Sequence, residues 1–362
     1  MKRTMIALCI SLAGVVGAVA SACADTEFQK RPEVVRDVPD TLQQAALRSP
    51  LAARSPLNAA ASAGERIVAV GARGHIVYSD DRGQSWQQAE VPVSVTLTGV
   101  CFADRDTGWA VGHRGVILKS VDGGQSWSKQ LDGRQAAARI LLARELQDPE
   151  RVPDARRLLM EGADKPFLDI QCVDRQHAAV VGAYGFGFVT RDGGDNWTPS
   201  LELLDGTEQR HVNVVREHGG QLYLAGELGM LLRLDSDLQQ LEPLGEPYPG
   251  SFFGLVVTRS GHLLAFGLRG NLFRSGDAGA SWQQVGFAGS QSLTAGVNLA
   301  DGGILLVDES GAGWLSRDDG QSFRPVRPSA QFPFAGLLAT ADGGSVAVGV
   351  NGVSFFEPGA LR

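Results

Sequence analysis

The chain has 362 residues, a formal net charge of −7 and 43% hydrophobic residues. This acidic balance argues against nucleic acid as a partner, because binding to phosphates needs a basic surface. The 46 glycines and only four cysteines indicate a turn-rich domain large enough to hold together without a disulfide scaffold.

Residues 1–24 are typical of an export signal, because Lys2 and Arg3 precede an apolar stretch that ends in small residues. We favour ordinary cleavage after the small-x-small sequence of residues 22–24, which changes the net charge from −7 to −9. The alternative is a lipid on Cys23, since residues 20–23 form an imperfect lipobox. We expect an exported protein, periplasmic or extracellular, whose membrane contact is at most peripheral or through that lipid.

One octapeptide recurs along the chain, with sequences such as SDDRGQSW and SVDGGQSW. Its spacing is 41 residues from Ser79 to Ser120 and again from Ser275 to Ser316. Degenerate copies within 224–241 and 347–359 raise the number of units to seven. Short strands with Gly/Asp turns at this period predict an all-β, seven-bladed β-propeller over residues 56–362. The clear octapeptides occupy residues 79–86, 120–127, 190–197, 275–282 and 316–323.

The second unit shows how the strands are expected to run, and the last unit shows what is missing. In the second unit we expect strands over 97–103, 109–112, 116–120 and 126–130. The seventh unit lacks room for a fourth strand. Residues 25–55 precede the first unit, and we expect part of Glu27–Val38 to return and supply this strand, which would close the ring.

An insertion over residues 131–165 separates the second and third units. Its pattern predicts helices over 134–147 and 154–161. It belongs to a connection between units, on the face that also carries the G-x-x-G turns preceding each octapeptide. Its six arginines are nearly balanced by acids, which favours a solvated helical hairpin; the alternative is a lid that docks a partner.

The octapeptide residues are expected to stabilise the fold and to take no part in catalysis. The aspartate can accept hydrogen bonds from its own turn, the glycine supplies a positive φ, and the aromatic residue wedges between blades. Each turn offers only one or two carboxylates, so we expect no metal and no cofactor. The residues assigned this role are Asp81, Trp86, Asp122, Trp127, Asp192, Trp197, Asp277, Trp282, Asp318 and Phe323.

The two cysteines beyond the signal, Cys101 and Cys172, lie at nearly matching places of apolar strands. We expect them to be two buried, unpaired, small hydrophobic residues. A disulfide is the alternative in an oxidising compartment.

A candidate partner-binding rim comes from the third position of the G-x-x-G turns. Arg73, Arg114 and Arg269 occupy it in what we count as blades one, two and six, and Tyr184 and Asn351 occupy it in other blades. Three arginines on an acidic protein can bind a carboxylate, a phosphate or an acidic loop. The alternative is that an exposed turn simply tolerates arginine.

The octapeptide S-x-D-x-G-x-S-W is similar to the Asp-box of bacterial sialidases. Together with the preceding G-W-A-V-G-x-x-G-x-I-L-K-S, clearest over Gly108–Trp127, it resembles the photosystem II stability and assembly factor family and its relatives in non-photosynthetic bacteria. The resemblance implies a monomeric, non-enzymatic scaffold with an arginine-rich patch that docks a membrane protein or envelope complex. Relatives of this kind are linked to RND-type exporters, so we favour a transporter accessory role over photosystem II assembly.

The alternative function is a secreted glycan-binding or sialidase-like glycan-cleaving propeller. A sialidase needs three arginines around the substrate carboxylate, a tyrosine nucleophile with a glutamate base, and an acid aspartate. Arginines and Tyr184 share one face, but no glutamate is evidently paired with Tyr184, and seven units replace the usual six. We therefore expect no enzyme.

Overall fold

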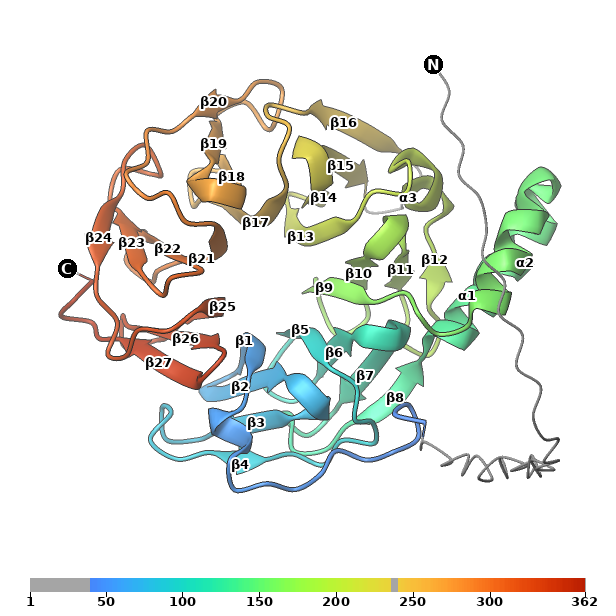
Figure 1. Cartoon of the computed structure of the whole chain (residues 1–362), viewed down its shortest axis with the longest axis horizontal. Coiled ribbons are helices and arrows are strands. Elements are labelled where there is room, and N and C mark those ends of the chain that lie inside the picture. The colour runs from blue at the N-terminus through green and yellow to red at the C-terminus, as the bar shows by residue number, and fades with distance from the viewer. Residues whose placement is uncertain (1–39, 236–239, 362) are drawn as a thin grey trace, which may run out of the picture. The chain divides into compact units, whose positions relative to one another are not determined.

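The structure, a computed structural model, describes residues 40–235 and 240–361. In this part of the chain, strands form seven antiparallel sheets, six of four strands and one of three. The sheets form a ring as the blades of a β-propeller, and helices α1 and α2 project outside this ring beside blade three (Figure 1). Residues of all seven inner strands line a central channel. The prediction of a seven-bladed propeller with a helical insertion between blades two and three is therefore confirmed.

Successive strands of a blade pair in sequence order from the channel outwards. Blades one to four comprise β1 (Leu57–Ala63), β2 (Arg66–Gly71), β3 (Ile76–Ser79), β4 (Gln87–Gln88); β5 (Leu97–Phe102), β6 (Gly108–Gly112), β7 (Val116–Ser120), β8 (Ser128–Leu131); β9 (Phe167–Cys172), β10 (Ala178–Gly182), β11 (Gly187–Thr190), β12 (Thr198–Pro199); and β13 (Val212–His218), β14 (Gln221–Gly226), β15 (Leu231–Asp235), β16 (Leu241–Gly245).

Blades five to seven comprise β17 (Phe252–Val257), β18 (Leu263–Gly267), β19 (Leu272–Ser275), β20 (Gln283–Gln284); β21 (Leu293–Asn298), β22 (Ile304–Asp308), β23 (Gly313–Ser316), β24 (Arg324–Val326); and β25 (Phe334–Ala339), β26 (Ser345–Gly349), β27 (Gly352–Phe356). The α-helices are α1 (Gly133–Gln147), α2 (Val152–Glu161) and α3 (Leu201–Gly206). Short 3-10 turns are η1 (Ala52–Arg54), η2 (Ala72–Gly74), η3 (His113–Gly115), η4 (Pro149–Arg151), η5 (Ala183–Gly185), η6 (Glu227–Gly229) and η7 (Leu268–Gly270).

The inner strands share a bulge near their first residue. In β1 the pairing register shifts between Leu57 and Ala59, which leaves Asn58 as the extra residue, and the same irregularity occurs in all seven blades. The freed Asn58 side chain donates a hydrogen bond to the Leu97 carbonyl of blade two at 2.7 Å. Equivalent bonds run from Thr98 to Phe167 and from Asn213 to Phe252. The bulges thus link neighbouring blades around the channel.

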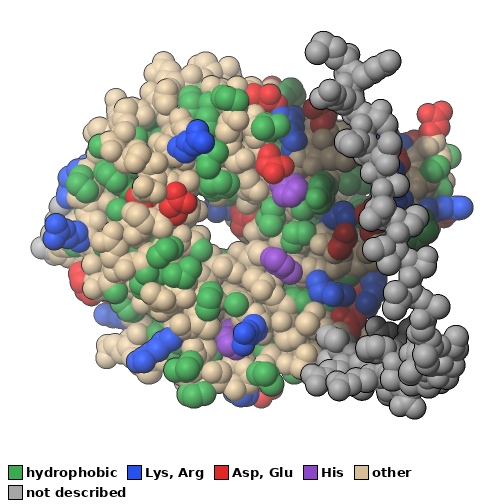
Figure 2. All heavy atoms as spheres, in the orientation of Figure 1, with side chains coloured by type: hydrophobic (Ala, Val, Ile, Leu, Met, Phe, Trp, Pro, Cys, Tyr) green, Lys and Arg blue, Asp and Glu red, His purple; other side chains and the backbone are tan. Residues whose placement is uncertain are grey.

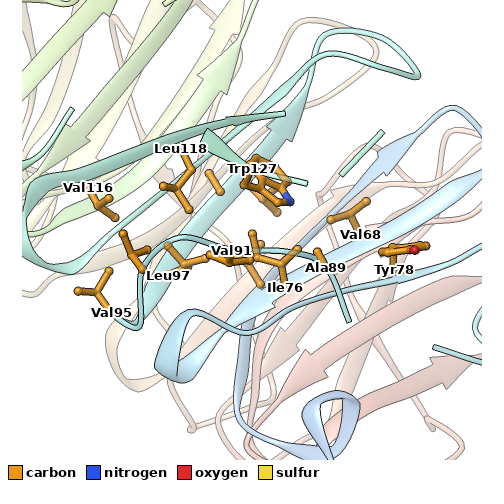
Figure 3. Packing of buried hydrophobic residues seen from close by; sticks show 14 of the residues in the cluster. Val68, Ile76, Tyr78, Ala89, Val91, Val95, Leu97, Val116, Leu118 and Trp127 are labelled. Atoms are coloured by element: carbon orange, nitrogen blue, oxygen red, sulfur yellow. The ribbon is translucent and has the colours of Figure 1, made fainter. Parts of the chain in front are cut away.

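The interfaces between blades are filled by apolar side chains from both sheets. At the first interface, Trp127 of blade two lies between Leu118 of its own sheet and Val68 of blade one (Figure 3). A β-carbon on Gly124 would come within 3.1 Å of Val68, so the octapeptide glycine also permits this close approach. Burying apolar side chains between neighbouring sheets makes the ring cooperative, since no sheet covers its own faces.

Blade seven closes the ring against blade one. A β-carbon on Gly336 of β25 would lie 2.8 Å from the carbonyl oxygen of Asn58, so the two inner strands pack tightly. At the outer edge of β27, the Ser329 amide donates to the Phe355 carbonyl at 2.7 Å, where a fourth strand would lie. The predicted contribution of Glu27–Val38 to this blade lies outside the described residues.

The segment 40–55 packs mainly on blades one and two. Leu42 is buried in the core between these blades, and the Ala46 amide donates to the Val91 carbonyl at 3.0 Å. At its end, η1 reaches blade seven, where a β-carbon on Gly352 would lie 2.1 Å from the Ala53 carbonyl oxygen.

The expected helices of the insertion agree closely with α1 and α2. Asp132 caps α1 by accepting hydrogen bonds from the amides of Arg134 and Gln135, and the Gln135 side chain caps in return. Pro153 lies in the first turn of α2, where its missing amide hydrogen costs nothing. The fourth strand of blade two begins at Ser128 instead of the expected residue 126, because the preceding residues complete the octapeptide loop.

The expectation of two unpaired cysteines is wrong. Cys101 of β5 and Cys172 of β9 form a disulfide, with their Cα atoms 5.8 Å apart. Both side chains are half-buried, and their inner strands lie side by side in blades two and three. Matching positions in successive repeats had been interpreted as equivalent core sites, but the ring turns them into neighbours.

Candidate functional site: the rim of the G-x-x-G turns

The rim residues occupy a strained backbone conformation. Five of the seven residues at the third turn position have φ between 55° and 60°, a left-handed conformation that costs roughly 1 kcal/mol for a residue with a β-carbon. The following glycine packs against a connection between blades; a β-carbon on Gly74, for example, would lie 2.2 Å from the Val93 carbonyl oxygen. The five residues are Arg73, Arg114, Tyr184, Leu228 and Arg269.

The three rim arginines differ in their surroundings. Arg114 forms an ion pair with Asp40 at 3.5 Å, whereas the exposed side chains of Arg73 and Arg269 have no hydrogen-bond or ion-pair partner among the described residues. Arg269 follows β18 and so belongs to blade five. Its predicted place in blade six is wrong. Two blades, and not one, therefore separate Arg269 from Arg73 on the shorter way round the ring.

Asp40 joins the rim to the insertion. It also pairs with Arg134 at the start of α1, with a distance of 2.9 Å. Hydrogen bonds from the Leu42 amide and from Arg134 lower the pKa of Asp40 below its usual value. The carboxylate therefore stays charged. It pairs with one arginine in the G-x-x-G turn of blade two and with another at the start of α1.

Tyr184 lies in a second group, at blades three and four. Its ring packs edge-on against His211, with centroids 4.6 Å apart, and the Lys165 ammonium lies 5.4 Å from the ring centroid. Although burial opposes it, hydrogen bonds to Asp164 and Glu161 raise the pKa of Lys165. Among the described residues, no hydrogen bond joins the Tyr184 hydroxyl to a carboxylate, and its backbone amide donates to His211 Nδ1 at 3.4 Å.

Asn351 lies apart from both groups. It is exposed in the turn between β26 and β27 and makes no side-chain hydrogen bond within the described chain. The structure thus distributes the predicted rim residues around the ring. Arg73, Arg114 and Tyr184 lie in blades one, two and three, Arg269 lies in blade five, and Asn351 lies in blade seven, which contacts blade one.

The channel itself is polar and narrow, with a volume of about 290 Å³. Asp169 of β9 accepts hydrogen bonds there from the Val215 amide at 3.0 Å and from Arg216. On the face shown in Figure 2, the channel opens as a hole near the centre, and acidic and basic side chains are interspersed around it. Binding of a partner to this face therefore depends on individual residues more than on an electrostatic potential of one sign.

The octapeptide loops lie on the opposite face and are closed by their own hydrogen bonds. In the first loop, Asp81 accepts from the amide and the hydroxyl of Ser85, at 2.8 and 2.5 Å, and from the Ser79 hydroxyl. The side chain and backbone of Ser85, followed by Ser79, lower the pKa of Asp81 to about 2. The Trp86 indole donates to the Gly83 carbonyl at 3.1 Å. These contacts leave the aspartate little capacity to bind a substrate.

The hairpin is fastened to the propeller by a buried arginine. Arg144 of α1 is only 3% exposed and pairs with Asp205 of α3, which also accepts a hydrogen bond from Arg151 at 2.7 Å. The sequence pattern had suggested neither α3 nor Asp205. A six-residue helix in a connection is too short to show a clear period, although Ser200 before it is a typical N-cap.

Two properties bear on catalysis and on membranes. Within residues 40–235 and 240–361, no group of three or more His, Cys, Asp or Glu side chains could hold a metal ion. No described helix is both long and apolar enough to cross a bilayer.

The fold and the turn geometry define a seven-bladed β-propeller with aspartate-closed loops on one face and an irregular, partly basic rim on the other. The family model described as photosynthesis system II assembly factor YCF48 matches residues 37–119 and 79–144. Over residues 37–144 the sequence is therefore similar to this family, and the match covers less than half of the chain. No match was found among curated proteins.

Several solved structures share the fold of this chain. A structure described as YCF48 bound to D1 peptide is 17% identical with a TM-score of 0.62, covering 88% of this chain and 97% of that one. YCF48 from Cyanidioschyzon merolae is also 17% identical, with a TM-score of 0.61 and coverage of 84% and 97%. The extracellular domain of the putative one component system BT4673 from B. thetaiotaomicron is 12% identical, with a TM-score of 0.63 and coverage of 86% and 40%.

Proposed function

We propose that the chain is an exported, non-enzymatic docking protein, periplasmic or extracellular, whose G-x-x-G face binds a membrane protein or envelope complex. The observation that carries this proposal is the pair of exposed rim arginines, Arg73 and Arg269. Their side chains have no hydrogen-bond or ion-pair partner in the described chain, and their backbones have a positive φ. Non-glycine residues in this backbone region cluster at binding sites, where function maintains them. Arginine is also the residue best suited to hold a carboxylate with two hydrogen bonds.

The comparisons support the direction of this proposal. The most relevant similar structure is described as YCF48 bound to D1 peptide, so a propeller of this architecture can hold a peptide. Because the likeness in sequence is low, the nature of the partner is our own inference. We take it to be an RND-type transporter, with the protein acting as a monomeric accessory factor.

The test is affinity co-purification from gently solubilised native membranes. The wild type is compared with the double variant Arg73→Glu/Arg269→Glu and with the matched control Arg82→Glu/Arg105→Glu, which makes the same change of charge on the octapeptide face. We expect one integral membrane protein to be enriched by the wild type and the control and lost with the rim variant. Recovery of no membrane protein, or equal recovery with all three, would contradict the proposal; hydrolysis of a fluorogenic sialoside by the wild type would favour the glycan-cleaving alternative.

A further inference from the structure

A cavity of about 430 Å³ lies between the helical hairpin and blade three. Its size falls within the range of sites that take small ligands, roughly 300–1,000 Å³. Side chains from α1, α2 and α3 line it together with rim residue Tyr184, so it opens beside the proposed docking face. Among the described residues, the insertion that builds it occurs in one of the six connections between successive blades.

The floor of the cavity is apolar. Ile140 and Ala155 are 2% and 3% exposed, and Leu158 and Leu204 are half-buried against the same core. Such a floor is suited to one aliphatic side chain, since each further buried methylene group adds favourable free energy.

The walls carry charges of both signs, with an excess of cations. Four basic side chains line the cavity against three carboxylates, whereas the whole chain has a net charge of −7. Each carboxylate is already engaged. Asp205 pairs with Arg144 and Arg151, Asp154 with Arg157, and Glu161 with Lys165.

The two exposed arginines retain unused donors. Arg151 donates one hydrogen bond, from Nη1 to Asp205, and its Nε lies 3.8 Å from Asp148. Arg157 donates one hydrogen bond, from Nη2 to Asp154. A guanidinium group has five N–H donors, so most of theirs have no acceptor among the described residues. Their side chains are 51% and 66% exposed and can be reached by a ligand from solvent.

We propose that this cavity binds a short acidic segment of a partner polypeptide, with its carboxylate on Arg151 and Arg157 and a neighbouring aliphatic side chain on the floor formed by Ile140, Ala155, Leu158 and Leu204. A basic segment is disfavoured because the carboxylates of the site are already paired. The inference rests on the proposed function only in taking the ligand to be part of a docked protein.

The experiment is an NMR titration of the full mature protein with blocked tripeptides. The acidic probe is acetyl-Leu-Glu-Leu-amide, the neutral probe is acetyl-Leu-Gln-Leu-amide, and sodium acetate serves as the free carboxylate. We expect the acidic peptide to bind at least about tenfold more tightly than the neutral one, as a charge-assisted hydrogen bond allows, and more tightly than acetate. Equal binding of the two peptides, binding no tighter than that of acetate, or no binding would overturn the inference.

Variants locate the site. Arg157→Gln and Arg151→Gln should each weaken binding of the acidic peptide about tenfold, while Arg105→Gln, an exposed arginine on the opposite face, should leave it unchanged. Arg157 is the safer test of the two, because its exposed ion pair within α2 contributes little to folding. Unchanged affinity in Arg157→Gln and Arg151→Gln, with peptide binding retained, would place the peptide elsewhere and refute the proposal.

The outcome is distinguishable from that of the proposed function. If the membrane partner co-purifies equally with wild type and with Arg157→Gln, and the peptides do not bind, the cavity proposal fails while the docking function stands. If the peptides bind as expected but no membrane protein is enriched, the docking function fails and the cavity remains an acidic-peptide site.

Discussion

At the scale of single residues, the octapeptide explains the fold through a few repeated contacts. A hydroxyl residue and an aspartate close each loop, and the aromatic residue fills the cleft next to the preceding blade. The depth of burial differs, however: Trp127 and Trp197 are 6% and 1% exposed, while Trp86 and Trp282 are only half-buried. This difference makes the role of the aromatic position testable.

Trp127→Ala is expected to lower the free energy of unfolding by about 3–5 kcal/mol, because it empties a packed interface between blades. Trp282→Ala should cost clearly less, since part of its ring already contacts solvent. Urea denaturation followed by far-UV circular dichroism measures both. Equal losses would show that burial at the blade interface is not what the aromatic residue contributes.

The closed aspartates also predict acid sensitivity. Hydrogen bonds hold the pKa of Asp81 and of Asp277 at about 2 in the folded protein, against a usual value of 3.8. A pKa lowered by folding adds stability above the unfolded value and loses it as the pH falls through the folded value. The melting temperature should therefore fall between about pH 4 and pH 2. In Asp81→Asn/Asp277→Asn it should start lower at neutral pH and decline less over that range; an identical decline would assign the acid sensitivity to other groups.

At the scale of elements, the hairpin of α1 and α2 is an addition to the repeating plan. The capping of α1 and the proline at the start of α2 are local features, which explains why the sequence pattern located both helices. The attachment of the hairpin to the propeller is not local, because Arg144 of α1 pairs with Asp205 of α3, which lies 61 residues later in the sequence. Only the folded ring brings these two elements together.

Arg144→Met is expected to lower the free energy of unfolding by about 3 kcal/mol, since removing one partner leaves a partly buried carboxylate with less compensation. The matched control is Arg156→Met on α2, whose side chain is 66% exposed and lies 3.8 Å from Glu145; such a pair contributes less than about 1 kcal/mol. Hydrogen exchange should show faster opening of α1 in the first variant alone. Unchanged exchange there would mean that the apolar contacts of α1 suffice to hold it.

At the scale of the whole molecule, ring closure and the disulfide act together. Within the described part of the chain, blade seven has three strands, and its inner strand β25 contacts β1 of blade one. The Cys101–Cys172 disulfide joins blades two and three and spans 71 residues, including the whole hairpin. Both features restrict how far the ring can open.

Reduction of this disulfide should lower the free energy of unfolding by about 4 kcal/mol, the loop-closure value for a link of this length. The measurement is the melting temperature with and without a membrane-permeant phosphine reductant. Cys101→Ser/Cys172→Ser should melt near the reduced wild type and should not respond to the reductant. A wild type that also ignores the reductant would show that the two thiols are unpaired in solution.

The sequence by itself determined the architecture of this protein, because a 41-residue period of short strands, turn glycines and closing aromatic residues leaves little choice but a ring of blades. It also located α1 and α2, whose caps are local. It did not determine which distant residues meet. The pairing of Cys101 with Cys172, the burial of Arg144 against Asp205, the contact of Asp40 with Arg114 and the place of Arg269 in the fifth blade all depend on how the ring closes. These contacts join residues separated by tens of positions, and no local period encodes such distances, so only the tertiary structure decided them.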